Sequence, residues 1–122
     1  PPPPGYIFSL DPDGTGRVVA EAGQTFPNGI TVEADGNVVW VESFTRAVRR
    51  YHVATGKVEE VCILQDPNAI PDGLKPATTG DLDIATVLTG GVSAIWFLSD
   101  ARKHRRAIAR TAPCLAHVEP WR

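Results

Sequence analysis

Pro27-Asn28-Gly29-Ile30 is repeated as Pro71-Asp72-Gly73-Leu74, 44 residues further along the chain. The same register continues without a gap for roughly 27 residues, which is long enough to indicate an internal repeat. Further along the chain it aligns Gly36 with Gly80, Trp40 with Ile84, Val48 with Val92 and Tyr51 with Ile95. A period of this length is typical of one four-stranded blade of a β-propeller.

One period contains four predicted strands, at residues 29–33, 37–43, 47–53 and 57–64. Turn signals separate them, such as Asp35-Gly36, in which glycine tolerates a positive φ. Further strands are predicted on both sides of this period, at 6–10, 17–20, 73–77, 81–87 and 91–98. We therefore predict an all-β fold of about two and a quarter four-stranded antiparallel blades, an incomplete propeller with almost no helix. This domain would span residues 1–98, followed by a basic tail at 99–122.

The repeated residues resemble those of a known family. Phe26–Ile30, followed by Asp35–Asn37 and Val41–Ser43, is similar to the middle of SMP-30/gluconolactonase-like sequences. Pro71–Leu74, followed by 80–82 and 85–92, is similar to their next blade, so the resemblance covers about residues 5–96. It implies a six-bladed propeller that hydrolyses lactones with a divalent cation at the mouth of its central channel. A strictosidine-synthase-like propeller has the same blade pattern without the paired ligands.

In that family the asparagine and the aspartate of the repeated motif bind the metal, which implies that Asn28 and Asp72 are ligands here. Their chemistry agrees, because amide and carboxylate oxygens are hard ligands suited to calcium. Calcium is the expected cation, with zinc, magnesium or manganese as alternatives. The resemblance also makes Asp72 the catalytic general base or the group that orients water. The alternative is structural: Asn28 would be a turn residue and Asp72 a turn residue or a strand-end cap.

Part of the family pattern is missing. The sequence has no Glu-Gly-Pro tripeptide, the usual context of a glutamate ligand, and an earlier blade's asparagine and arginine substrate contacts would precede Pro1. We therefore expect a truncated member that acts on lactone substrates with impaired activity. The alternative is a non-enzymatic repeat module that forms homo-oligomers through its open blade edges.

Other residues in the repeat are expected to have structural roles. Trp40 and Tyr51 are predicted to pack between blades, and Glu42 and Ser43 to form hydrogen bonds between blades. Arg49 and Arg50 should pair with Glu59 and Glu60 on a solvated outer hairpin, with His52 on the same solvated face. Cys62, within an apolar run, is expected to be a buried free thiol.

Charge divides the chain. Residues 1–100 contain six Lys/Arg and thirteen Asp/Glu, whereas 101–122 contain six Lys/Arg and one Glu. The tail has three interpretations: translation from a wrong reading frame, an amphipathic helix on a sheet edge, or a basic arm for nucleic acid or membrane. We favour the first and predict neither a nucleic-acid nor a membrane partner. The absence of a signal-peptide pattern predicts a cytoplasmic protein.

Overall fold

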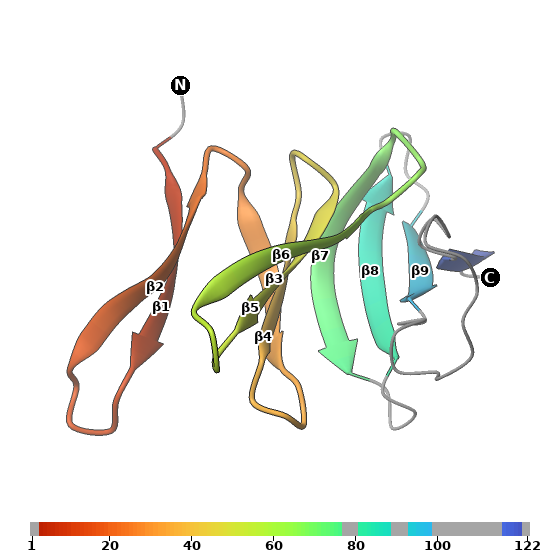
Figure 1. Ribbon diagram of the computed structural model, residues 1–122. Coiled ribbons are helices and arrows are strands. Elements are labelled where there is room, and N and C mark those ends of the chain that lie inside the picture. Colours follow the sequence, from red (N-terminus) through yellow and green to blue (C-terminus); the bar gives the residue numbers. More distant parts are fainter. Residues whose placement is uncertain (1–2, 77–80, 89–92, 99–115, 121–122) are drawn as a thin grey trace.

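The computed structural model describes residues 3–76, 81–88, 93–98 and 116–120. All regular structure in these residues is antiparallel β-sheet, which confirms the all-β prediction (Figure 1). A two-stranded sheet contains β1 (Gly5–Leu10) and β2 (Gly16–Gly23). A four-stranded sheet contains β3 (Pro27–Val32), β4 (Val38–Glu42), β5 (Ala47–His52) and β6 (Lys57–Ile63) in that order. A second four-stranded sheet contains β7 (Ala69–Pro76), β8 (Leu82–Leu88), β9 (Ser93–Leu98) and β10 (Ala116–Pro120).

The predicted glycine turns connect the strands. Gly14, Gly36 and Gly56 have φ values of 89°, 88° and 69° in the turns after β1, β3 and β5. Glycine adopts these values without the steric cost that a Cβ atom would add. The predicted strands from residue 6 to residue 98 are therefore confirmed, with shifts of a few residues at their ends.

The two four-stranded sheets repeat one register. Pro27 pairs with Glu42 and Ile30 with Trp40 in the first, and Pro71 pairs with Thr86 and Leu74 with Ile84 in the second. Each partner in the second sheet lies 44 residues after its counterpart in the first, so the repeat is present in the hydrogen-bonded ladder as well as in the sequence.

The register differs at the third strand, where the gapless alignment is wrong. Val41 pairs with Val48, but its equivalent Ala85 pairs with Ile95, so three more residues separate the partners in the second sheet. Ile95 therefore occupies the position of Val48, which the alignment had assigned to Val92. A gapless comparison cannot detect an insertion between strands whose patterns are both apolar.

The tail contributes a strand. Ala116–Pro120 pairs with β9 and completes the second sheet, so this part of the tail is β-strand and not helix. Residues 99–115, where most of the predicted tail lies, are outside the described residues. The sheet therefore takes its fourth strand from a segment that is distant in the sequence.

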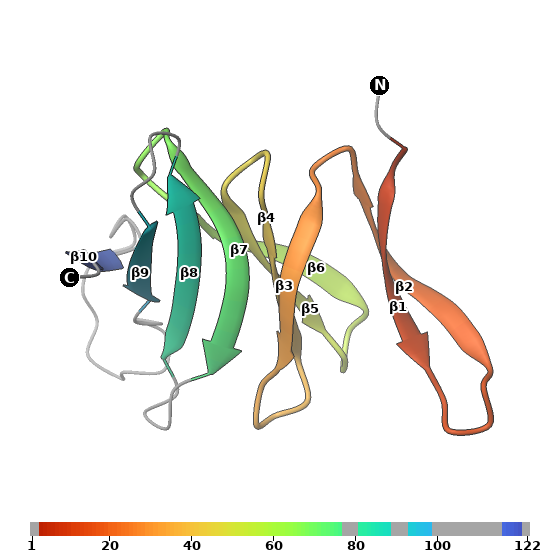
Figure 2. The ribbon, with the colours of Figure 1, turned by 180° about the vertical axis from the view of Figure 1, so that it is seen from behind.

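The first four-stranded sheet lies between the other two sheets (Figure 2). One face packs against the second four-stranded sheet, through a core that includes Val39, Val48, Leu82 and Ile84. The other face packs Trp40 against Ile7 and Ala20 of the hairpin, with Tyr51 partly buried beside them. The predicted packing role of Trp40 and Tyr51 is thus confirmed.

The ion pairs between β5 and β6 were predicted correctly, but their surroundings were not. Arg49 pairs with Glu60 at 3.1 Å and Arg50 with Glu59 at 3.8 Å. Arg50 is buried and binds the buried carboxylate of Glu33 through two nitrogens, at 2.5 and 3.2 Å. His52 is half-buried and lies 2.7 Å from Glu59, so this face is not a solvated one.

Cys62 on β6 is disulfide-bonded, so the expected free thiol is wrong. The chain's other cysteine, Cys114, lies outside the described residues. The prediction of a thiol was based on the apolar run around Cys62 and on the wide spacing of the two cysteines in the sequence, and neither feature excludes a disulfide.

Candidate functional site: two bulges on neighbouring strands

Both predicted ligands lie in a β-bulge. The register on β3 advances three residues, from Pro27 to Ile30, while β4 advances two, so Asn28-Gly29 contains one extra residue. The same irregularity lies between Pro71 and Leu74 on β7. Bulges of this kind redirect side chains and are common beside active sites. Because both motifs are inside strands, the interpretation of Asn28 as an ordinary turn residue is wrong.

The two bulges lie side by side. β3 and β7 are neighbours that run in the same direction from the same end of their sheets (Figures 1 and 2). Gly29 touches the backbone of β7: a methyl group on it would lie 2.5 Å from the Asp72 carbonyl oxygen and 2.6 Å from the Leu74 amide nitrogen. Only glycine allows this approach. The fold therefore places Asn28 and Asp72, distant in sequence, on adjacent strands.

Ser43 connects the two strands. The Asn28 Nδ2 donates to Ser43 Oγ at 3.3 Å, and Ser43 Oγ donates to the Pro71 carbonyl at 2.5 Å. The predicted role of Ser43 in a bond between sheets is confirmed. Glu42 does not share it: its bonds with Trp40 and Thr45 stay within one sheet. With its nitrogen bound to Ser43, the Asn28 amide keeps its oxygen for another partner.

Asp72 has an exposed side chain. Within the described part of the chain, the structure records no hydrogen bond or ion pair to its carboxylate. Its catalytic role stays a prediction. The Asp72 carboxylate and the Asn28 amide oxygen, on neighbouring bulges, are both hard oxygen ligands.

The pair is only part of a calcium site, because calcium takes six to eight oxygen ligands. The described residues contain no cluster of three or more His, Cys, Asp or Glu side chains that could hold a metal. The donor chemistry at Asn28 and Asp72 fits a hard divalent cation, while the number of ligands requires water, substrate or another protein segment to supply the rest.

Two aromatic residues beside the pair were missed as functional candidates. Phe26 lies two residues before Asn28, and Phe44 directly follows Ser43. Their rings are stacked, with centroids 5.1 Å apart, and both are more than half exposed. The sequence signal that could have identified them is that one phenylalanine lies close to Asn28 and the other directly follows Ser43. Their contact could not be predicted, because it depends on a loop geometry that the sequence does not reveal.

No model of a known protein family matches this chain, and no curated protein matches it. Among the described residues there is also no helix with the length and apolar character needed to cross a membrane.

Proposed function

We propose that the chain is part of a lactone-hydrolysing β-propeller of the SMP-30/gluconolactonase-like type, with each four-stranded sheet as one blade. Asn28 and Asp72 would hold a divalent cation, calcium in the first place. The observation that carries this proposal is that residues 44 apart form identical bulges on neighbouring strands. Repeats packed around an axis bring equivalent positions together, as a metal site on that axis requires.

Each residue would have a defined task. Ser43 accepts a hydrogen bond from the Asn28 amide nitrogen, which would leave the amide oxygen for a cation. A bound cation would polarise the lactone carbonyl and stabilise the negative charge that develops on its oxygen. Asp72 would orient a water molecule and accept its proton as the water oxygen bonds to the carbonyl carbon. The ring C–O bond then breaks, and the alkoxide takes up a proton to give the hydroxy acid. With two protein ligands in place we expect weak activity.

Calcium titration by isothermal calorimetry tests the proposal, on protein whose solution mass is measured by light scattering. We expect saturable binding that Asp72→Ala weakens at least about tenfold, because a carboxylate ligand is lost. Asp11→Ala is the matched control: Asp11 is also exposed, but follows β1 at the opposite end of the sheets. Absence of calcium binding by folded protein, or equal binding by both variants, would overturn the proposal.

A second candidate function is self-association as a non-enzymatic module. The face of the hairpin that points away from the first four-stranded sheet is apolar and exposed; it consists of Tyr6, Phe8, Leu10 and Val18, at 40, 65, 74 and 54% exposure. Apolar surface of this kind is typical of protein contacts. A solution mass that rises with concentration and falls in Leu10→Lys would support it, whereas a monomer at all concentrations would reject it.

A further inference from the structure

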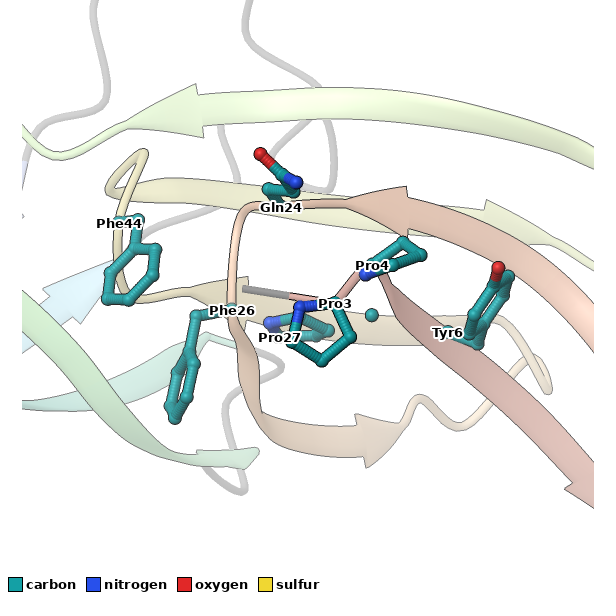
Figure 3. A pocket seen from close by; sticks show the side chains of 8 residues that line it. Pro3, Pro4, Tyr6, Gln24, Phe26, Pro27 and Phe44 are labelled. Atoms are coloured by element: carbon teal, nitrogen blue, oxygen red, sulfur yellow. The ribbon is translucent and has the colours of Figure 1, made fainter. Parts of the chain in front are cut away.

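A pocket lies beside the first bulge, at the end of the sheets where β3 begins. Its volume is about 360 Å³, within the range of small-molecule sites. It is lined by Pro3, Pro4, Gly5, Tyr6, Gln24, Phe26, Pro27 and Phe44 (Figure 3). The lining contains no charged side chain, and Gln24 and the Tyr6 hydroxyl are its polar side-chain groups. Its chemistry suits a flat, apolar group.

The aromatic wall of the pocket is held at an energetic cost. Phe26 has a φ of 57°, a left-handed conformation that disfavours residues with a Cβ atom. Two backbone hydrogen bonds fix this conformation: Ser43 N donates to the Phe26 carbonyl at 2.9 Å, and Phe44 N donates to the Thr25 carbonyl at 3.1 Å. Strained positions that the surrounding structure imposes are concentrated at ligand-binding and active sites.

The pocket adjoins the first bulge along the chain. Phe26-Pro27 leads directly into Asn28, and Phe44 directly follows the serine that bonds Asn28 and the Pro71 carbonyl. A ligand in the pocket would therefore have its apolar part against the phenylalanines and could extend a polar end toward Asn28.

We propose that this pocket binds the flat apolar part of a small-molecule ligand, with Phe44 as its principal contact. Combined with the proposed function, on which this second step depends, the substrate is a lactone with an aromatic or other apolar substituent and not a polyhydroxylated one. The binding step does not depend on a metal or on lactone hydrolysis.

The binding step is tested with 2-naphthol, titrated without calcium and followed by ligand-observed NMR. We expect saturable binding, weakened about tenfold by Phe44→Ala because one aromatic contact is lost. Phe8→Ala is the matched control, since Phe8 is 65% exposed against 62% for Phe44 but does not line the pocket. If Phe44→Ala bound naphthol as tightly as the unsubstituted protein, or if no saturable binding were seen, the proposed ligand pocket would be overturned.

A second variant separates loss of the site from loss of the fold. Phe26→Gly removes the ring and also the backbone strain, because glycine adopts a positive φ freely. We expect its melting temperature to be unchanged or higher and its naphthol binding to be weakened, because the second ring of the stacked pair is lost. Naphthol affinity equal to that of the unsubstituted protein would contradict the proposal that this pocket is the binding site.

The substrate step is tested in calcium with γ-phenyl-γ-butyrolactone and glucono-δ-lactone. Faster hydrolysis of the phenyl lactone, with a preference that Phe44→Ala reduces, would support the substrate class; a preference for gluconolactone would overturn it. Naphthol binding that depends on Phe44, in protein without calcium affinity, would support the pocket and reject the lactone step alone.

Discussion

In the first four-stranded sheet Asn28 is bonded to Ser43, whereas in the second the residue equivalent to Ser43 is Val87, which offers Asp72 no such partner. The difference matches the two side chains. An amide has a donor end and an acceptor end, so it must be oriented, whereas both oxygens of a carboxylate accept equally. The repeat therefore preserves the backbone geometry while the side-chain support differs between sheets.

A second difference lies in the pairing of the second and third strands of each sheet. Arg50 pairs across the ladder with Val39, and Phe97 occupies the equivalent position opposite Asp83. In the first sheet this position is occupied by Arg50, which forms a buried ion pair with Glu33. In the second sheet the equivalent residue is the aromatic Phe97.

The largest expected effect comes from breaking this ion pair. Arg50→Ala would leave the buried Glu33 carboxylate without its guanidinium partner, which costs about 3–5 kcal/mol. Urea unfolding measures the loss. Glu60→Ala is the control: it removes an ion pair whose side chains are 28 and 45% exposed, worth less than about 1 kcal/mol. If both variants lost a similar free energy of unfolding, burial would not make the Arg50–Glu33 ion pair more stabilising than the Arg49–Glu60 pair.

The next effect tests the two bulge glycines against each other. A methyl group on Gly29 would meet backbone atoms at 2.5–2.8 Å, whereas on Gly73 its nearest contact is the Ala85 methyl at 3.7 Å. We expect Gly29→Ala to lose about 3 kcal/mol in thermal unfolding, because backbone on both sides must move. Gly73→Ala should lose less than about 1 kcal/mol. Equal losses would contradict the close approach of β3 and β7.

Ser43→Ala tests the support of the first bulge. It removes the donor to the Pro71 carbonyl and the acceptor for Asn28, for a stability loss of about 1–2 kcal/mol. Calcium affinity in calorimetry should fall about tenfold, because an unsupported amide ligand loses its orientation. Val87→Ala, at the equivalent position, should leave calcium affinity unchanged. A Ser43→Ala protein with unchanged affinity would remove Ser43 from the site.

The smallest effect lies in the β1–β2 turn, outside the two repeats. The backbone and side chain of Thr15 donate to Asp13 and hold its pKa below the ordinary value of 3.8. Since the folded-state pKa is below the unfolded one, the ionised Asp13 carboxyl stabilises the folded protein. This stabilisation is present above pH 3.8 and is lost as the pH falls through the folded-state pKa. NMR titration of the Asp13 carboxyl should give a midpoint below 3.8; a midpoint at or above it would contradict the turn geometry.

The strands were predictable because turn chemistry and apolar runs are local. The 44-residue repeat also predicted that Asn28 and Asp72 hold equivalent positions, which the paired bulges confirm. The bulges themselves were not predictable, since Pro-Asn-Gly is equally compatible with a turn. Burial of Arg50 was missed because charged residues mixed with apolar ones indicate a solvated face unless another segment supplies a buried partner, here Glu33 directly after β3.

Strand β10 has a consequence for the order of folding. In the first four-stranded sheet every strand pairs with the next along the chain, through short connections. The second closes only when Ala116–Pro120 returns to β9 across residues 99–115. Long loops are entropically costly to close, and non-local pairings form slowly. We therefore expect the first sheet to form early as the chain leaves the ribosome, and to serve as the surface on which the later, slower sheet assembles.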